Sequence, residues 1–465
     1  MKMWSGRFRE PLNPQFERWQ RSFPFDQQLL EEELAASRAH ALALHLAGVL
    51  STAERDAVLG GLNYIATHGE ELRRDETDAE DVHHFVEKQL TQAIGETGLK
   101  LHTGRSRNEQ IATDLRLFVR KSCRNLTEAL EELIAALLTQ ARRAGEAAMP
   151  AYTHLQRAEP VLVAHWLLAY CEMFFRDVDR LADCAARLNY CPLGSGAVAG
   201  ATLQLDRELM ARELDFSAPT ANSLDATSDR DFCLEFTQVL SIVAIHLSRL
   251  AEEFILFSTQ EYGFITLPES YSTGSSAMPQ KQNPDSLELI RGKSGRIIGC
   301  SQSLLICLKG LPMAYDKDMQ ETQEPVFTAV RETMAMLQVA AGFIREVQLN
   351  TARMSAAAET GYMNAMAAAT YLVGKGIPFR HAHELVGQAV RIGIEKQCEL
   401  QQIPLAELKQ LSPEFDADFY TAITLRAVLE CHDVVGGTAP AHVLKALDAA
   451  EQRLKNCKEI VHAGA

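Results

Sequence analysis

The sequence predicts an all-α protein with three mostly helical domains, and three observations support this expectation. Apolar residues recur along most of the chain at the spacing of helices, whereas the alternation typical of strands is scarce. Five stretches with helical spacing are unusually long. Polar residues concentrate in short segments at the ends of these stretches. We therefore expect long helices that carry functional groups at their ends.

The expected elements follow one another in three blocks. Residues 1–105 form an N-terminal helical domain with short helices, and residues 357–465 form a small C-terminal helical domain. Residues 106–356 form the central domain of long helices. The five long helices are predicted over residues 110–147, 160–190, 229–262, 284–308 and 325–355. A proline, whose missing N–H costs nothing in a first helical turn, stands near three of these starts, at Pro160, Pro284 and Pro325.

The long helices are apolar on more than one face, which predicts self-association. Residues 232–257 leave only a narrow polar stripe. A helix of this kind must be buried nearly all round. One bundle of five helices cannot bury all these faces, so we expect a homo-oligomer with a helical core.

Composition narrows the class of protein. The chain has 465 residues, 47% of them hydrophobic, and a net charge of −15, which speaks against nucleic acid or an anionic membrane as partner. Its 10 cysteines show no metal-binding spacing, which favours small core residues in a reducing compartment. No apolar stretch has the length of a membrane span, and residues 1–14 contain no signal-peptide core. We expect a cytoplasmic protein.

The segment "STGSSAMPQKQNPDSLELIRG" at residues 272–292 is the first candidate site. Asn283 suits an N-cap and Pro284 a first helical residue, so free N–H groups and partial positive charge are expected there. Lys281 adds a full charge, and the backbone of residues 274–278 offers further N–H groups. These features suit a carboxylate or phosphate. A flexible surface loop remains the alternative.

Three further polar segments add chemical groups. "HTGRSRNEQ" (102–110) offers guanidinium forks for carboxylates, or a solvated turn that caps a helix. "YTHLQRAEP" (152–160) holds His154 outside any apolar face, as a functional group or a surface residue. In "TDAEDVHHFVE" (77–87), a capping box precedes His83 and Glu87, one helical turn apart. The third lacks HExxH and an evident third ligand, so no metal site is expected.

A glycine-rich stretch, "GSGAVAG" (194–200), follows a helical pattern rather than a strand. The context of a dinucleotide site is therefore missing, and a close-packed turn is expected. Together, the segments supply cations, hydrogen-bond donors, a histidine and a serine, without a metal or nucleotide motif. This inventory suits acid–base chemistry on a small polyanion, with no cofactor.

Four segments carry a resemblance to a known family. "GSSAMPQKQN" (274–283) fits the pattern GSSxMPxKxN of the fumarase/aspartase superfamily of elimination enzymes. "HTGRSRNEQIATDLRL" (102–117), "YTHLQRAEP" (152–160) and "MWSGRF" (3–8) narrow the resemblance to the argininosuccinate lyase/δ-crystallin family. It covers nearly the whole chain.

The resemblance implies a fold and a reaction. The fold has three helical domains, and four subunits join their central five-helix bundles into a twenty-helix core in a homotetramer. Each active site draws loops from three subunits. The reaction is the reversible elimination of fumarate from argininosuccinate to give arginine, without a cofactor. A base removes a proton beside a carboxylate, and stabilisation of the resulting dianion is essential.

The resemblance also implies residue roles. Ser275 is the base, on the loop 272–283 that closes over the substrate, and His154, held by Glu288, is the acid that protonates the leaving nitrogen. The sequence leaves open whether acid and base are reversed. Lys281 joins the catalytic set by holding a substrate carboxylate. Asp81 and His83 shape the pocket, and the other implied substrate contacts are Ser22, Arg107, Asn108, Thr153, Asn283, Tyr315 and Gln320.

The chain departs from the family pattern at three polar positions. Gln323 stands where lysine is usual, Asp316 replaces a usual asparagine, and Glu159 a usual glutamine. Loss of a cation at 323 weakens the expected hold on the arginine carboxylate. A related C–N lyase acting on another N-substituted aspartate therefore remains an alternative, and a catalytically silent, crystallin-like structural protein is a remote one.

Overall fold

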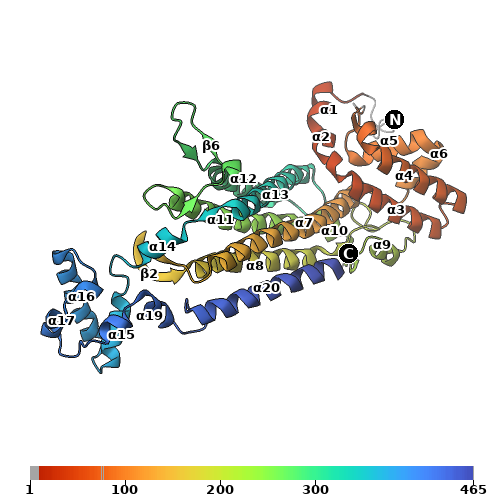
Figure 1. The fold of residues 1–465 in the computed structure, drawn as a ribbon. Coiled ribbons are helices and arrows are strands. Elements are labelled where there is room, and N and C mark those ends of the chain that lie inside the picture. The colour runs from red at the N-terminus through yellow and green to blue at the C-terminus, as the bar shows by residue number, and fades with distance from the viewer. Residues whose placement is uncertain (1–9, 75, 77, 464–465) are drawn as a thin grey trace. The chain divides into compact units, whose positions relative to one another are not determined.

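Five long helices form the middle of the chain, as the sequence predicts (Figure 1). The computed structural model describes residues 10–74, 76 and 78–463. Described strands are short, with 7 residues at most, so the predicted all-α class is confirmed. The long helices are α7 (Arg107–Ala144), α8 (Val163–Leu188), α11 (Asp231–Ser258), α12 (Asp285–Leu308) and α13 (Gln323–Glu346).

The last long helix is shorter than predicted. α13 ends at Glu346, whereas the sequence analysis extended it to residue 355. The Asn350 N–H bonds the carbonyl of Phe264 at 2.8 Å, and its side-chain amide bonds the carbonyl of Gly263 at 2.9 Å. These bonds tie residue 350 to a distant segment, so the helix cannot continue through it.

The helix α8 also begins later in the sequence than residue 160, where it was predicted to start. Pro160 lies in a strand, and the helix begins only at Val163. Residues 156–162 pair antiparallel with residues 148–153, and Pro160 stands opposite Pro150. A two-stranded ribbon leaves one side of each strand free, which is where a residue without an N–H is tolerated.

Two predicted helix starts need correction. Asn283 is not the N-cap of α12: it lies on a short strand, and the carbonyl of Pro284 accepts the first helical bonds from Leu287 and Glu288, each at 3.0 Å. At the other start, Asp81 caps the helix that contains His83. The predicted capping box began at Thr77, which lies outside the described residues.

The chain divides into two units by its contacts. The first contains residues up to 126, 179–241 and 296–333. A cluster of alanine, leucine and other apolar side chains between α3 and α9 forms one of its cores. Its elements besides the long helices are α1 (Pro14–Gln20), α2 (Phe23–Asp26), η1 (Gln27–Leu29), α3 (Leu30–Leu46), α4 (Thr52–Arg74), α5 (Val82–Ile94), α6 (Glu96–Leu99), η2 (Lys100–His102), β3 (Tyr190–Cys191), α9 (Arg207–Glu213), β4 (Ala218–Pro219), α10 (Ser223–Ser228) and η4 (Lys317–Thr322).

The second unit contains residues 127–178, 242–295 and 334 onward. Leu372, Phe415 and Phe419 are buried in the core of its C-terminal helices. Its further elements are β1 (Ala148–Thr153), β2 (Gln156–Leu162), β5 (Ile265–Thr266), η3 (Glu269–Tyr271), β6 (Thr273–Gly274), β7 (Gln282–Asn283), β8 (Gln348–Leu349), α14 (Thr351–Ala358), α15 (Ala365–Gly374), α16 (Phe379–Lys396), η5 (Leu400–Gln402), α17 (Leu405–Leu411), α18 (Phe419–Ala422), α19 (Leu425–Glu430) and α20 (Pro440–Ala463).

Two close contacts fix the start of the segment that contains the fumarase/aspartase pattern. A Cβ at Gly342 would overlap the Tyr271 hydroxyl, so only glycine lets this ring lie against α13. The Ser286 hydroxyl bonds the carbonyl of Tyr271 at 2.7 Å. Residue 271 is therefore anchored on both sides, and the loop that follows it begins from a fixed point.

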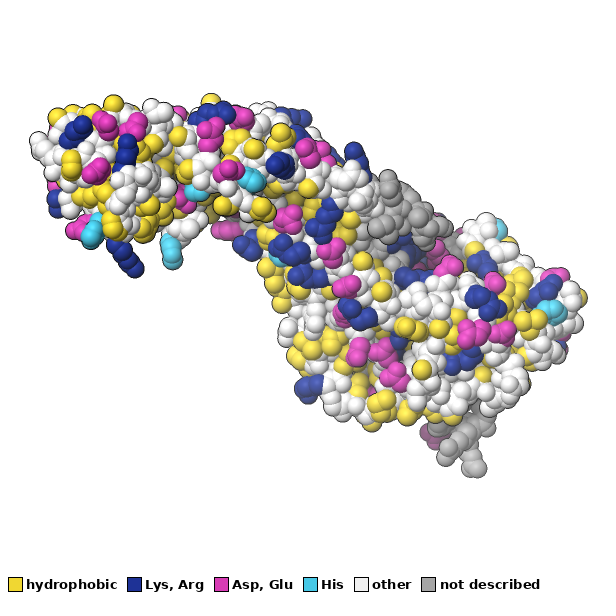
Figure 2. All heavy atoms as spheres, turned by 90° about the horizontal axis from the view of Figure 1, so that it is seen from below, with side chains coloured by type: hydrophobic (Ala, Val, Ile, Leu, Met, Phe, Trp, Pro, Cys, Tyr) yellow, Lys and Arg dark blue, Asp and Glu magenta, His cyan; other side chains and the backbone are white. Residues whose placement is uncertain are grey.

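The charged side chains of the described surface are of both signs. On the face drawn in Figure 2, Lys and Arg side chains are interspersed with Asp and Glu rather than gathered into one basic surface. None of the described helices combines the length and apolarity needed to cross a bilayer. The ten cysteines are all free thiols, but only five are buried, fewer than the core-residue interpretation implied.

Candidate active site

The predicted site residues lie in both units of the chain. The first unit holds Ser22, Asp81, His83, Arg107, Asn108, Tyr315 and Gln320. The second holds Thr153, His154, Ser275, Lys281, Asn283 and Glu288. In each unit these residues come from segments that are far apart in the sequence.

Asp81 forms a charged centre at the start of α5. Its carboxylate accepts the His84 N–H at 2.6 Å and lies 3.4 Å from the Arg107 Nε. Burial opposes ionisation of Asp81, but the Arg107 charge and the helix cap hold its pKa below the ordinary value. The carboxylate is therefore ionised, and it places the guanidinium of Arg107 beside the first turn of α5.

Asp26 lies next to this centre, and its pKa is shifted in the opposite direction to that of Asp81. Its Oδ1 accepts the Val82 N–H at 3.0 Å, and it is hydrogen-bonded to the side chain of Ser22. Burial, with the neighbouring charge of Asp81, raises the pKa of Asp26 to about 7. The structure thus brings Ser22 and Asp81 together around one buried carboxyl group.

Two predicted contacts of the 314–324 segment lie in the same unit. Tyr315 interacts electrostatically with both Asp81 and Arg230, and burial raises its pKa to about 12. The Gln320 amide donates to the carbonyl of Gln20 at 3.1 Å, close in sequence to Ser22. Both residues therefore belong to the first-unit part of the candidate site.

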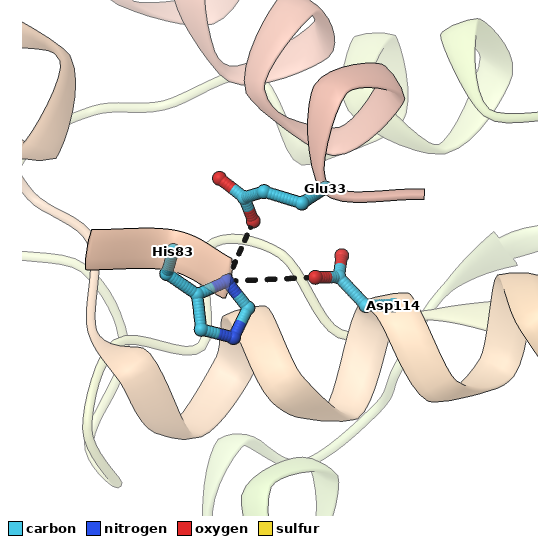
Figure 3. A group of neighbouring side chains, drawn as sticks. All are labelled: Glu33, His83 and Asp114. Atoms are coloured by element: carbon cyan, nitrogen blue, oxygen red, sulfur yellow. Dashed lines mark hydrogen bonds and ion pairs between the residues drawn. The ribbon is translucent and has the colours of Figure 1, made fainter. Parts of the chain in front are cut away.

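One ring nitrogen of His83, Nδ1, lies beside two carboxyl groups (Figure 3). Its Nδ1 lies 2.8 Å from Glu33 and 3.5 Å from Asp114, and all three residues are buried. Figure 3 shows the other ring nitrogen pointing away from both carboxyl groups. An Nδ1–H donated to Glu33 fixes the ring and leaves Nε2 as the second functional atom.

The pKa values of the two carboxyl groups beside His83, those of Glu33 and Asp114, are shifted in opposite directions. Glu33 accepts the Ser37 hydroxyl at 2.6 Å and the Gln110 amide at 3.2 Å, and Arg105 lies 3.7 Å away. Burial opposes its ionisation, yet Arg105 and these donors hold its pKa well below the usual range. Asp114 has no donor on either oxygen among the described residues. Burial and the charge of Glu33 raise the pKa of Asp114 well above its usual value, which favours its protonated form.

The Glu33–His83–Asp114 cluster has ligand types suitable for a metal, with ligand atoms within 4.8 Å of one another. However, hydrogen bonds occupy the carboxylate of Glu33, and the guanidinium of Arg105 lies beside it. A cation there would meet a positive charge and compete with several donors. The cluster is better suited to orienting His83 than to binding a metal.

Sequence reasoning missed Glu33 and Asp114. A signal was present, because Leu30, Glu33 and Ser37 share one face of α3, and that face is buried. A charged residue at a core position of a helix indicates that it has a buried polar partner. Composition alone does not identify that partner.

In the second unit, His154 stands at the tip of the β1–β2 hairpin. Thr153 pairs with Gln156, so His154 and Leu155 form a two-residue turn. Their φ values of 54° and 58° match a type I′ turn, in which both central residues are left-handed. Thr153 and His154 are exposed at this tip.

Ser275 lies in the loop between β6 and β7, whose strands pair Thr273 with Asn283. The Ser275 Oγ accepts the N–H groups of Ala277 at 3.2 Å and Met278 at 3.1 Å. Two donors directed at one hydroxyl oxygen stabilise negative charge on it. Lys281 is exposed on the same loop.

Glu288 lies in the first turn of α12 and is exposed, as is His154. Within the described chain, no hydrogen bond or ion pair joins these two residues. A cavity of about 780 Å³ adjoins the hairpin and is lined by Tyr152, Leu155 and Arg157 among others, but not by Ser275 or Lys281. It is therefore separate from the predicted catalytic loop.

Comparison with known proteins identifies the family. The profile of a family described as "Lyase" matches residues 6–299, and one described as "Argininosuccinate lyase C-terminal" matches residues 362–430. An argininosuccinate lyase of Acidobacterium capsulatum is 61% identical over 97% of this chain and 95% of its own length. One of Koribacter versatilis is 59% identical over the full length of both chains. The chain belongs to the argininosuccinate lyase family.

The structural comparison agrees with this family membership. An EDDS lyase in complex with formate has a TM-score of 0.85 at 27% identity, and covers 98% of this chain and 93% of its own. A class II fumarase from Schistosoma mansoni, at 17% identity and a TM-score of 0.72 over 86% of this chain and 91% of that one, shares the fold. The resemblance drawn from the four sequence segments is confirmed. Argininosuccinate lyases are carbon–nitrogen lyases, so the predicted enzyme class is confirmed as well.

Proposed function

We propose that the protein is a cytoplasmic argininosuccinate lyase, which releases fumarate from argininosuccinate reversibly and leaves arginine. Family membership over the whole chain supports the reaction. The Ser275 oxygen that accepts two backbone N–H groups supports the chemistry. A serine removes a carbon-bound proton only if its alkoxide is stabilised, and these two donors supply that stabilisation.

The proposed mechanism begins on the 272–283 loop. Ser275 removes the proton beside the substrate carboxylate, while Lys281 and Asn283 bind succinyl carboxylates and stabilise the dianion. His154, assisted by Glu288, protonates the leaving guanidinium nitrogen. The reversed assignment of acid and base remains an alternative. No metal or cofactor takes part in the proposed reaction.

The remaining residues surround the arginine portion and the dianion. Asp81 is ionised beside Arg107, and Nε2 of His83 is directed away from its carboxyl partners. Ionic groups of both signs suit a substrate that carries carboxylates and a guanidinium. The proposed substrate contacts are Ser22, Arg107, Asn108, Thr153, Tyr315 and Gln320, with Asp81 and His83 shaping the pocket.

We also propose a homotetramer with shared active sites. Ile245 of α11 and Leu289 and Ile306 of α12 are exposed apolar side chains on the long helices. Such residues favour burial against other subunits. The proposed domains are residues 1–105, 106–356 and 357–465, with the central domain contributing the twenty-helix core.

The decisive experiment is fumarate release from argininosuccinate, followed by ultraviolet absorbance. Loss of the base in Ser275→Ala is expected to lower kcat by about 10²–10⁴-fold. Gln280→Ala is a matched control, because it alters the same exposed loop at a variable position of the GSSxMPxKxN pattern and is expected to keep kcat within about threefold. Wild-type protein that releases no fumarate would contradict the proposal.

A lyase for another N-substituted aspartate is the second candidate. Gln323 in place of lysine and the similarity to an EDDS lyase favour it. A panel of N-substituted aspartates separates the two, since the preferred substrate has the highest kcat/KM. If Gln323→Lys raises kcat/KM for argininosuccinate and lowers kcat/KM for another N-substituted aspartate, the result supports the second candidate.

A further inference from the structure

Arg230 is a buried cation with unused hydrogen-bond donors. The side chain precedes α11 in the first unit and is 1% exposed. Its Nη1 donates to the carbonyl of Asp229 at 2.7 Å. Nε and Nη2 are buried without a hydrogen-bond partner among the described residues. Leaving buried donors of a charged group unpaired is energetically unfavourable. We therefore expect Nε and Nη2 of Arg230 to bind an acceptor that does not belong to the described residues.

The carboxylate of the neighbouring residue, Asp229, is bonded to groups other than Arg230. The carboxylate of Asp229 is ion-paired with Arg116 through Oδ2 and accepts the Asp231 N–H at 2.7 Å through Oδ1. Arg116 is itself buried and lies over the ring of Phe232 at 4.7 Å. The Asp229 carboxylate is thus engaged by Arg116 and the Asp231 N–H, and it accepts no hydrogen bond from Nε or Nη2 of Arg230.

The segment facing Arg230 also lacks partners for buried polar atoms. Tyr315 interacts electrostatically with Arg230. The residues after it include Asp316 and Gln323, whose Oδ2 and Oε1 are buried without a donor among the described residues. Gln323 is 2% exposed and neutral, so it offers no charge to an anion. The unpaired donors of Arg230 suit a carboxylate, and the segment after Tyr315 supplies unpaired acceptors that suit an ammonium group.

We infer that Arg230 binds the α-carboxylate of the arginine portion of the substrate. The inference rests on the proposed function and assigns a specificity-determining residue to it. The Nε and Nη2 atoms of a guanidinium form a fork with the spacing of a carboxylate's two oxygens. Burial lowers the pKa of Arg230, but a guanidinium remains charged at neutral pH, and a bound carboxylate would accept hydrogen bonds from the unused Nε and Nη2 donors.

The test uses the reverse reaction, with fumarate and either arginine or agmatine, which is arginine without its carboxylate. Wild-type enzyme is expected to prefer arginine in kcat/KM by about 10–100-fold, the range of a charged hydrogen-bonded contact. Arg230→Met should remove this preference, through a higher KM for arginine and an unchanged KM for agmatine. The carboxylate is remote from the reacting guanidinium nitrogen, so kcat should change little.

Two further variants make the result interpretable. Arg187→Met replaces an exposed arginine of the same unit, paired with Glu235, and should retain the wild-type preference. Arg230→Lys keeps the charge without the fork and should retain part of the preference. It also decides the question if Arg230→Met does not fold, as judged by circular dichroism.

Three outcomes would overturn the inference: wild-type enzyme that uses arginine and agmatine equally, an Arg230 variant with undiminished preference, or one that loses the same factor with both amines. These results are distinct from failure of the proposed function, in which wild-type protein releases no fumarate from argininosuccinate.

Discussion

At the scale of single residues, the pair behind His83 allows two near-isosteric substitutions with opposite expectations. Glu33→Gln removes a buried anion and leaves Arg105 without its carboxylate, so the free energy of unfolding should fall by about 3 kcal/mol. Asp114→Asn replaces an acid whose raised pKa favours the neutral form by a neutral amide, and it should change the free energy of unfolding by less than about 1 kcal/mol. Urea denaturation at equal protein concentration measures both. Equal losses would show that both carboxyl groups are ionised.

Asp26 makes stability depend on pH in an unusual direction for an acid. Its folded pKa of about 7 lies above the ordinary 3.8. Between these values the folded protein keeps a proton that the unfolded chain releases, so rising pH favours unfolding by up to about 1.4 kcal/mol per pH unit. The contribution is complete below the unfolded pKa and is lost as pH rises through the folded one.

Asp26→Asn should remove this dependence, since the amide keeps an acceptor for the Val82 N–H. Urea midpoints of wild type and variant at pH 5 and pH 7.5 measure it. The variant should gain stability relative to wild type at the higher pH. A constant difference between the two proteins would contradict the shifted pKa.

Single residues could be proposed as functional from the sequence only where they belong to a sequence pattern. Ser275 and Lys281 stand in one recognisable segment, so they could be singled out from the sequence. Glu33, Asp114 and Arg230 could not, because their significance depends on partners brought together from distant segments. A buried charge acquires meaning only when its neighbours are known.

At the scale of elements, the side chain of Gln140 on α7 caps the C-terminal end of a different helix, α13. Gln140 of α7 is 3% exposed and donates to the carbonyls of Ile344 at 2.7 Å and Val347 at 3.1 Å. These carbonyls belong to the last turn of α13 and the residue after it, where intrahelical donors run out. The side chain thus joins α7 to the end of α13.

Gln140→Leu preserves volume but leaves these carbonyls without that donor. The free energy of unfolding should fall by about 1–3 kcal/mol, measured by urea denaturation. Thr139→Val is the matched control, because its exposed hydroxyl bonds only the carbonyl of Ala135 on its own helix. It should change stability by about 0.5 kcal/mol at most. Similar losses in both variants would exclude the proposed role of Gln140.

The elements show why helices were predicted better than strands. Long amphipathic patterns locate α7 and α11 within a few residues. The β1–β2 hairpin was missed because its exposed strand ends lack a regular apolar alternation. Its pairing comes from the local turn at residues 154–155, and that turn has no glycine or asparagine to reveal it.

At the scale of the whole molecule, the exposed apolar residues of α12 predict assembly. Ile306 is 66% exposed in the single chain. Light scattering should give a mass four times that of one chain, and Ile306→Asp should lower both the mass and the lyase activity, because a charge would be buried at the subunit interface. Leu46→Asp, on an exposed apolar residue outside the long helices, should leave the mass unchanged. A variant at 306 that keeps its mass would place the interface elsewhere.

Architecture as a whole was the easiest property to predict, since it follows from many weak helical signals that agree. The arrangement of the site was the hardest. Its proposed residues lie in two units, and His154 and Glu288 are both exposed on separate elements of the second unit. The sequence identifies the chemical groups, but the distances between them depend on the folded structure.

The turn at His154 and Leu155 has a consequence for attempts to engineer heat tolerance. Non-glycine side chains with left-handed backbone carry a penalty of about 1 kcal/mol each, which an Asn-Gly pair avoids. A library screened only for survival at high temperature would therefore enrich glycine and asparagine at these two codons. The most heat-stable variants would lack the imidazole of His154, on which the proposed chemistry depends. Such a screen must therefore also measure turnover.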